Sequence, residues 1–445
     1  MTRFRWVVLA IIFVTYAINF ADRSNIGVAL PFIQKEFHFN NFEAGAIASF
    51  FFLGYAISQI PAGFWLSKFG ARGMVPVSIL GFSLFTYLIG TAQSVAAIKW
   101  FRLGLGIFEG PTPVGLTSTI NNWFPAREKA TGVGVYIAST MFAPIVIPPL
   151  CVWIATEFGW RTIFYTFALP GFIMAGIWYW LVRNQPAESP YVNEQEINYI
   201  QESTAEQTSQ IQTQAVSLGW LDRLIRAKKI KKIDARSNIF TSWNIWGNCF
   251  AYFMMVSVLY GLMTWIPSYL VNAKHYSFIK MGFVAAAPWV GGLIGSILGG
   301  WISDKLLHKR RKPTMLLTAL STCFMMIVMV NLPESSTAVA TALFMTGFLL
   351  NIGWPAFTAY PMGLTTGSTY PIAIALVNSG GNLGGFFSPM IAGALLDKFQ
   401  NYDFVFTYFG VAAIIGFIII LTLDEPVQLK TAEGRDINGR VGSSC

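Results

Sequence analysis

Long apolar runs separated by short polar segments divide the chain into two similar sets. Twelve runs are long enough to cross a hydrocarbon core of about 30 Å as helices that rise about 1.5 Å per residue. They cover residues 6–33, 43–66, 73–92, 96–120, 131–155, 162–182, 239–272, 281–303, 314–332, 336–362, 370–396 and 404–423. The pattern predicts an all-α membrane protein with twelve transmembrane helices in two pseudo-symmetric six-helix bundles.

A polar stretch between the two sets marks the expected domain boundaries. We expect an N-terminal bundle over 1–182, a linker over 183–238, a C-terminal bundle over 239–425 and a tail over 426–445. The linker contains a basic run from Arg223 to Arg236. Such a run predicts a short amphipathic helix on the anionic surface of the membrane.

Basic residues gather on one side of the predicted membrane, and this distribution predicts the orientation. They occur at the N-terminus, after the second and fourth runs, in the linker and after the eighth run. The positive-inside rule makes this side cytoplasmic, so both termini are expected inside. Examples are Arg3, Arg5, Lys68, Arg72, Arg127, Lys129, Lys305, Arg310, Arg311 and Lys312.

A short motif is repeated at the same topological point of both halves. Residues 63–68, after the second run, match residues 300–305, after the eighth run. Two six-helix repeats are typical of transporters that bind their substrate between the repeats, near the middle of the membrane.

Composition excludes several classes of protein. The chain has 445 residues, of which 54% are hydrophobic and 11% charged, whereas soluble domains carry about 25% charged residues. The excess of Lys and Arg lies between apolar runs, as topology signals do, so no nucleic-acid partner is expected. We find no spacing typical of a metal site, a phosphate loop or a catalytic nucleophile, so we expect no metal, no cofactor and no enzyme.

Two charged residues interrupt the first apolar run. Asp22 and Arg23 are the only charged residues between Trp6 and Ile33. A charge at membrane depth costs at least a few kcal/mol, so it faces a cavity or a partner and by default marks a transport pathway. The alternative is a structural pair that locks two helices together.

A second pair of charges lies in the fourth run. Arg102 and Glu109 are seven residues apart, about two helical turns, so both project from one face of a helix. Arginine stays charged and matches a carboxylate with its planar fork. A carboxylic acid in a low dielectric favours its neutral form, which suits a reversible proton site. The four charges sum to zero when both acids are ionised.

The second half contributes neutral side chains to the expected site. Residues 237–273 and 335–396 carry no charge. Polar and aromatic groups there can hydrogen-bond hydroxyls and stack on sugar-like faces, although packing or lipid contact is an equal alternative for each aromatic residue. The candidates are Tyr260, Trp265, Asn351, Trp354, Tyr360, Asn378, Ser379 and Asn382.

Several motifs resemble the major facilitator superfamily and, within it, the anion:cation symporter family of sugar-acid and related organic-anion transporters. The resemblance covers essentially the whole chain. It rests on residues 22–27, Tyr55 with 59–63, 102–111, 123–129, 265–267 and Asn378 with Gly380 and Gly381.

The resemblance implies roles for individual residues. Arg23 is expected to bind the substrate carboxylate, Asp22 to be a proton site, and Glu109 to be a proton site coupled to Arg102. The implied substrate-binding residues are Arg23, Tyr55, Arg102, Thr140, Trp354 and Asn378, and those of a cytoplasmic gate are Lys68, Arg72, Asp304 and Lys305.

The sequence therefore predicts a secondary transporter that imports a small organic anion, most simply a sugar acid such as a hexonate or hexuronate, by proton symport and alternating access. The alternatives are another carboxylate such as an aromatic acid or tartrate, an exchanger or uniporter, and a non-transporting sensor. The expected partners are the anion, protons and the lipid bilayer. A monomer in a bacterial inner membrane is expected.

Overall fold

A computed structural model of the chain describes residues 2–206, 219–228, 230, 232–308, 310–333, 335–366 and 369–426, and it is almost entirely helical. The predicted tail, residues 426–445, lies outside the described residues except for Pro426. The N-terminal half consists of α1 (Phe4–Phe37), α2 (Asn41–Thr91), α3 (Val95–Glu109), α4 (Thr112–Trp123), α5 (Ala126–Phe158) and α6 (Trp160–Leu181).

The C-terminal half repeats this arrangement with more interruptions. Its helices are α10 (Trp243–Asn272), α11 (Phe278–Val284), α12 (Ala287–Trp301), α13 (Lys312–Val330), α14 (Ser336–Ile352), α15 (Trp354–Leu364), α16 (Tyr370–Phe399) and α17 (Tyr402–Thr422), with one π-helical turn, η3 (Ile302–Leu306). Between the halves lie η1 (Pro186–Glu188), α7 (Glu194–Glu206), α8 (Trp220–Leu224), strand β1 (Ala227–Lys228) and α9 (Arg236–Thr241), and strand β2 (Glu425–Pro426) follows α17.

Nine helical stretches among the described residues are long and apolar enough to cross a membrane. They are Phe4–Phe37, Pro61–Thr91, Thr131–Phe158, Trp160–Leu181, Trp243–Asn272, Phe278–Leu306, Lys312–Val330, Ser336–Leu364 and Tyr402–Thr422. All nine coincide with apolar runs that the sequence pattern selects.

Two interruptions explain where the helices differ from the expected runs. The second and third runs form the single element α2, which changes direction at Gly70, where φ is +65° and a side chain would be strained. The fourth run is divided at Gly110 and Pro111, between the end of α3 at Glu109 and the start of α4. Proline lacks a backbone N–H and favours such a boundary.

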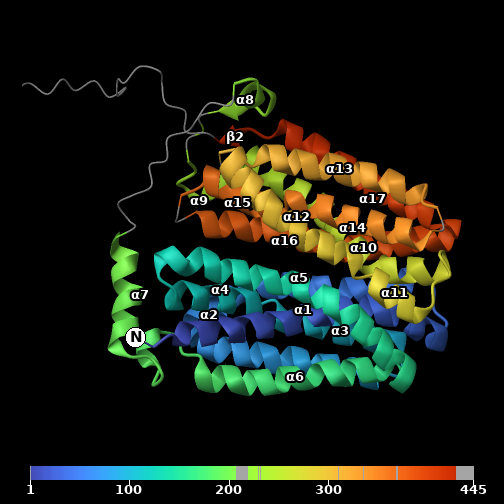
Figure 1. Cartoon of the computed structure of the whole chain (residues 1–445), viewed down its shortest axis with the longest axis horizontal. Coiled ribbons are helices and arrows are strands. Elements are labelled where there is room, and N and C mark those ends of the chain that lie inside the picture. Colours follow the sequence, from blue (N-terminus) through green and yellow to red (C-terminus); the bar gives the residue numbers. More distant parts are fainter. Residues whose placement is uncertain are drawn as a thin grey trace, which may run out of the picture.

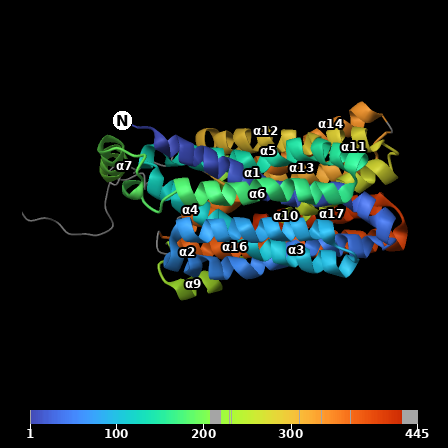
Figure 2. The same cartoon turned by 90° about the horizontal axis from the view of Figure 1, so that it is seen from below.

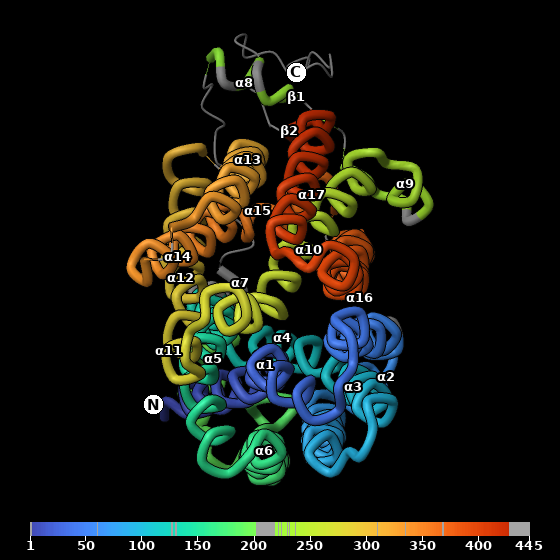
Figure 3. The backbone as a smooth tube through the Cα atoms, turned by 90° about the vertical axis from the view of Figure 1, so that its right-hand side faces the viewer, coloured from blue at the N-terminus to red at the C-terminus, as the bar shows by residue number. Residues whose placement is uncertain are grey.

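The two halves lie side by side, with their helices roughly parallel (Figure 1). The N-terminus, α7, α8 and α9 lie at one end of the bundle, which we call the linker end, and α11 lies towards the opposite end (Figure 1). The second view also shows the N-terminus and α7 at one end of the molecule and α11 at the other (Figure 2). Within the N-terminal half, α6 lies on the outer side, away from the C-terminal half (Figure 3).

The halves are joined tightly at the opposite end. Asp397, near the end of α16, accepts hydrogen bonds from the backbone N–H groups of Asn41 and Phe42 at 2.8 Å each. The rings of Phe32 and Phe278 stack with their centroids 4.2 Å apart. A Cβ at Gly393 would lie 2.2 Å from the backbone oxygen of Asn41, so glycine permits this close approach.

The linker is attached to both halves rather than to one. On α7, Glu196 pairs with Arg5 at 2.9 Å, and Arg5 also pairs with Glu128 on α5 at 2.9 Å. Beyond the undescribed residues 207–218, strand β1 pairs in parallel with β2. The first part of the linker is thus fixed to the N-terminal half, and the second part to the C-terminal half.

The basic run does not form the single amphipathic helix that we expect from the sequence. Its described residues include the end of α8, strand β1, an irregular stretch over 232–235 and the first residue of α9. Asp424 explains the difference, because its carboxylate pairs with Arg226 at 3.0 Å and with Lys228 at 3.1 Å. These ion pairs and the strand pairing hold the run against the C-terminal half.

A buried carboxylate at this junction gives a testable dependence on pH. Glu425 is 1% exposed and accepts hydrogen bonds from the backbone N–H groups of Arg311 at 2.9 Å and Lys312 at 2.7 Å. Burial raises the pKa of Glu425 from 4.5 to about 7, and the two hydrogen bonds and the positive charges of Arg311 and Lys312 oppose this rise.

We expect Glu425→Gln to weaken the pH dependence of stability. The folded chain holds the proton of Glu425 more tightly than the unfolded chain does, so its contribution to stability is lost as pH rises from 4.5 to about 7. Melting temperatures in detergent should therefore fall less between pH 5 and pH 8 in the variant than in the wild type. Asp403→Asn, at the opposite end, is the control, and equal pH dependence of Glu425→Gln and wild type would contradict the expectation.

Candidate functional site

A cavity of about 320 Å³ lies between the halves, and residues from both of them line it. The N-terminal half contributes residues of α1, α2, α4 and α5, and the C-terminal half contributes residues of α10, α12, α15 and α16. The lining residues are Tyr16, Phe20, Arg23, Tyr55, Gln59, Pro113, Tyr136, Ile137, Thr140, Met141, Tyr252, Val256, Leu259, Tyr260, Trp289, Ser296, Trp354, Pro355, Thr358, Asn378, Gly381 and Asn382.

Arg23 provides the only charged side chain among these lining residues. It is 5% exposed and is held by three partners: its Nε lies 3.1 Å from Glu109, its Nη2 donates to Asn19 at 3.2 Å, and its Nη1 donates to Tyr260 at 3.4 Å. Tyr260 lies on α10 of the C-terminal half. The guanidinium is therefore fixed in the N-terminal half and also contacts the other half.

Aromatic rings surround the same guanidinium. The Cζ atom of Arg23 lies 4.6 Å from the ring centroid of Phe20, 5.1 Å from that of Phe51 and 4.5 Å from that of Tyr55. Such rings attract a cation without neutralising it. The arrangement stabilises a buried positive charge.

Glu109 is paired with Arg23 and not with Arg102, the partner that the sequence analysis assigns to it. Glu109 is fully buried; its Oε2 accepts from Arg23, whereas its Oε1 has no described hydrogen-bond partner. Close helix packing produces the contact, since a Cβ at Gly106 would lie 2.0 Å from the backbone oxygen of Phe51. Glycine thus allows the end of α3 to approach α2 closely.

Arg102 contacts backbone oxygens in this structure and not the cavity. Its Nη1 donates to the backbone oxygen of Asp22 at 3.0 Å, and its Nε donates to the backbone oxygen of Ile47 at 3.3 Å. It is 1% exposed and does not line the cavity. In this conformation Arg102 joins α3 to α1 and α2 behind the wall of the cavity.

Asp22 also lies behind the cavity wall. Its carboxylate accepts a hydrogen bond from Thr86 at 2.9 Å and another from Asn25 at 3.2 Å. No ion pair within 4.0 Å joins Asp22 to a described residue. The two acids therefore differ: Glu109 forms an ion pair with the guanidinium that faces the cavity, whereas the carboxylate of Asp22 is held by two neutral hydrogen-bond donors.

The other expected substrate-binding residues do line the cavity. Tyr55 and Thr140 lie on the N-terminal side, and Trp354 and Asn378 lie on the C-terminal side. Trp354 packs against Tyr252 with their ring centroids 5.2 Å apart. The structure thus brings Arg23 and four neutral candidates to one space.

The expected gate residues lie at the linker end and do not meet one another across the halves in the described contacts. Asp304 pairs with Arg311 of its own half at 2.6 Å, and Lys305 is exposed. Lys68 lies 5.3 Å from the ring of Phe69, and the guanidinium of Arg72 lies 4.9 Å from the ring of Tyr179. Any gate formed by these residues belongs to another conformation.

Two aromatic candidates of the second half have structural contacts instead. The indole of Trp265 donates to the backbone oxygen of Pro389 at 3.1 Å, and the hydroxyl of Tyr360 donates to that of Asp424 at 2.6 Å. Neither residue lines the cavity. Their polar atoms are satisfied by backbone groups, as is usual for buried aromatic residues.

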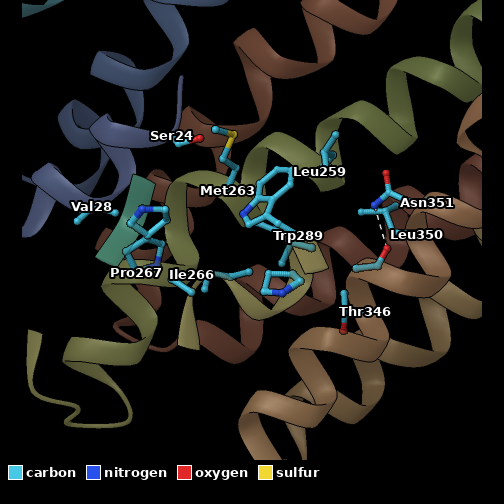
Figure 4. Close-up of a pocket in the computed structure, with 15 residues that line it drawn as sticks. Ser24, Val28, Leu259, Met263, Ile266, Pro267, Trp289, Thr346, Leu350 and Asn351 are labelled. Carbon is cyan, nitrogen blue, oxygen red and sulfur yellow. Dashed lines mark hydrogen bonds between the residues drawn. The ribbon is translucent and has the colours of Figure 1, made fainter. Parts of the chain in front are cut away.

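A smaller pocket of about 30 Å³ adjoins the cavity (Figure 4). Trp289 lines both spaces, and Ser24, Met263 and Asn351 are among the other lining residues of the pocket. Asn351 donates to the backbone oxygen of Gly347 at 2.9 Å (Figure 4). This candidate therefore lies beside the cavity rather than in it.

Sequence reasoning missed several residues around Arg23. Tyr16 and Tyr136 line the cavity and stack with their ring centroids 4.5 Å apart, and Asn19 orients the guanidinium. Helical spacing could have identified Asn19, which precedes Arg23 by four residues, and Tyr16, which precedes it by seven. Tyr136 lies on another helix, and no local signal connects it with Arg23.

Among the described residues, no group of three or more His, Cys, Asp or Glu side chains could hold a metal ion.

Comparison with known proteins connects this geometry with a family. The model of the Major Facilitator Superfamily matches residues 12–369 and 309–441. A D-galactonate transporter of Escherichia coli O6:H1 (strain CFT073) is 29% identical, with 96% of this chain and 97% of that protein covered. A protein of Bacillus subtilis (strain 168) named as a probable galactarate/D-glucarate transporter is 27% identical, with 97% and 95% covered.

Solved structures share the fold. A bacterial homologue of the human lysosomal transporter Spinster, in an inward-facing and unoccupied conformation, superposes with a TM-score of 0.73 at 17% identity and covers 95% of this chain and 96% of its own. A D-xylose-proton symporter superposes with a TM-score of 0.72 at 14% identity, with 94% and 98% covered. At these identities the likeness concerns the fold alone.

Proposed function

Because this chain belongs to the major facilitator superfamily, we propose that it imports a sugar acid together with protons by alternating access. Family membership and the relatives confirm a transporter rather than an enzyme, and an integral protein of the bacterial inner membrane. The named relatives are a D-galactonate transporter and a probable galactarate/D-glucarate transporter. Their shared chemistry is a carboxylate on a polyhydroxylated chain.

Charge in the cavity favours a monocarboxylate within this group. Arg23 is the only charged residue among those that line the described cavity, and its guanidinium offers one planar fork to one carboxylate. A second carboxylate of an aldarate would meet neutral side chains such as Asn378 and Thr140. A sugar acid with one carboxylate and several hydroxyls therefore fits the cavity better than a diacid does.

The observation that carries the proposal is the ion pair between Arg23 and Glu109 at the cavity wall. A substrate carboxylate and the Glu109 carboxylate compete for the same guanidinium. Burying both anions beside one cation leaves an uncompensated charge in a low dielectric, which is costly. Protonation of Glu109 removes that cost, so binding of the anion and uptake of a proton favour each other.

Asp22 supplies a second proton site in this account. It is 1% exposed and has no described ion pair, so its neutral form is compatible with its hydrogen bonds to Thr86 and Asn25. Two protons and one monoanion give a net positive charge per cycle. An inside-negative potential then favours uptake by about 2.3 kcal/mol per charge per 100 mV.

Topology and domain organisation complete the proposal. We infer twelve spans in two six-helix bundles, residues 1–182 and 239–425, with a cytoplasmic linker and both termini inside. The basic residues of the linker end support this orientation. Contacts between the halves at the opposite end support the proposal that this conformation is an inward-facing state of the proposed cycle.

Uptake into proteoliposomes with independently set pH gradient and voltage tests the proposal. We expect accumulation of radiolabelled D-galactonate when the outside is acidic, and additional stimulation when the inside is negative. Galactarate is the diacid control and should be taken up less well. Uptake that does not change with the pH gradient or with the voltage would contradict symport and would instead indicate exchange or uniport.

A further inference from the structure

Two guanidinium groups converge on one backbone oxygen at the linker end of the N-terminal half. The Nε of Arg72 lies 3.4 Å from the carbonyl oxygen of Tyr179, and the Nη1 of Arg183 lies 3.0 Å from the same oxygen. Both side chains donate to the same oxygen, so the two guanidinium groups lie close to each other. Lys68 precedes Arg72 by four residues, on the other side of the change of direction at Gly70, and adds a third positive charge to this end of the half.

Nine ion pairs are found among the described residues of the whole chain. None of them joins a carboxylate to Arg72, Arg183 or Lys68. One function of the arginines is to cap the last turn of α6, because Tyr179 is close to its end. A single guanidinium with its five N–H donors would satisfy that oxygen. Two uncompensated cations at such a distance repel each other, so the arrangement favours an anion between them.

Exposed aromatic residues indicate the depth of this cluster. Phe64 is 73% exposed, Trp180 is 71% exposed and Phe69 is 56% exposed, and Tyr179 lies beneath the guanidinium of Arg72. Aromatic residues of membrane proteins are enriched at the boundary between headgroups and acyl chains. Arg72 and Arg183 therefore lie at headgroup level.

Apolar side chains continue from the cluster towards the middle of the membrane. Exposed Val77, Leu80 and Leu84 follow one another at helical spacing on α2, and Ile173 and Leu169 are exposed on α6. α2 and α6 pack against each other, and α6 lies on the outer side of the half (Figure 3). The outer surface thus offers cations at one end and apolar surface along its length.

We propose that Arg72 and Arg183 form a binding site for the phosphate of an anionic phospholipid, with the acyl chains lying along α2 and α6. Arginine pairs recognise phosphate through directed, charge-assisted hydrogen bonds. The apolar surface distinguishes a lipid from free phosphate. This site is distinct from the transport cavity, and the proposal holds whatever substrate is carried.

Native mass spectrometry of the full chain in detergent, with added phosphatidylglycerol or phosphatidylcholine, tests the site. We expect the wild type to bind phosphatidylglycerol in preference, and Arg72→Gln/Arg183→Gln to reduce the bound fraction at least about fivefold, the effect expected when a charge-assisted hydrogen bond is lost. The matched control is Lys232→Gln/Lys305→Gln, which removes two exposed charges at the same end. It should bind as the wild type does.

A variant that retains both positive charges separates loss of binding from loss of folding. Arg72→Lys/Arg183→Lys retains both charges and should retain more binding than the glutamine variant. Unchanged phosphatidylglycerol binding in Arg72→Gln/Arg183→Gln would overturn the proposal, and so would an equal loss in the control pair. Displacement of phosphatidylglycerol by millimolar inorganic phosphate would overturn the lipid assignment in favour of a free-phosphate site.

Discussion

Arg23→Ala is expected to abolish measurable binding of the sugar acid. The substrate carboxylate loses both arms of a charge-assisted pair, each worth about 1.5–3 kcal/mol, so the affinity should fall by about 100-fold or more. Isothermal titration calorimetry with D-galactonate and purified protein measures this loss. Arg23→Lys should recover little of the affinity, because an ammonium group lacks the planar fork.

A second variant separates lost binding from lost folding. Arg23→Ala alone leaves the buried Glu109 without its cation, and an uncompensated buried charge costs about 3–5 kcal/mol of stability. Arg23→Ala/Glu109→Gln removes both members of the pair and should melt closer to the wild type. If this neutral double variant binds D-galactonate with wild-type affinity, Arg23 is not the anion site.

Glu109→Gln is expected to uncouple transport from the proton gradient. Glutamine resembles the protonated acid, so Arg23 is permanently available for the substrate carboxylate. The variant should bind D-galactonate and exchange it across the membrane, but an acidic outside should no longer drive accumulation. Counterflow and gradient-driven uptake, measured in the same proteoliposomes, distinguish the two activities.

The control for this variant removes another glutamate that is held by an ion pair. Glu43 pairs with Lys99 at 2.6 Å, outside the cavity, so Glu43→Gln should keep gradient-driven uptake. Asp22→Asn should behave as Glu109→Gln does if Asp22 is the second proton site. Full accumulation by Glu109→Gln would mean that this carboxylate is only a structural partner of Arg23.

Apolar periodicity predicted most of the helices because a spanning helix has to be apolar over its whole length, whatever packs against it. Periodicity could not predict the break at Gly110 and Pro111, since the residues on both sides continue the apolar pattern. It also could not predict that a single residue with non-helical backbone, Gly70, separates the second and third runs.

The site could be predicted by residue type but not by pairing. Charges at membrane depth are costly, so Asp22, Arg23, Arg102 and Glu109 were recognisable from the sequence alone. The family resemblance implied that Glu109 is coupled to Arg102, whereas the observed partner, Arg23, is 86 residues away on another helix. That contact depends on how closely α3 approaches α2 and α1, which the local sequence does not specify.

The conformation of the linker also depends on contacts that its local sequence does not specify. Its basic run has the composition of a membrane-surface helix, yet Asp424, almost 200 residues further on, pairs with Arg226 and Lys228. Tertiary ion pairs and strand pairing with β2 determine its conformation. Charge composition could predict that the basic run binds an anionic group, but not that this group is a carboxylate of the same chain.

Proton uptake on substrate binding is the most direct test of the central claim, that the substrate carboxylate replaces Glu109 at Arg23. Calorimetric titrations of D-galactonate at one pH, in buffers with different ionisation enthalpies, give the number of protons taken up on binding. The account predicts net proton uptake by the wild type near neutral pH and fewer protons for Glu109→Gln. Binding by the wild type without any change in protonation would contradict it.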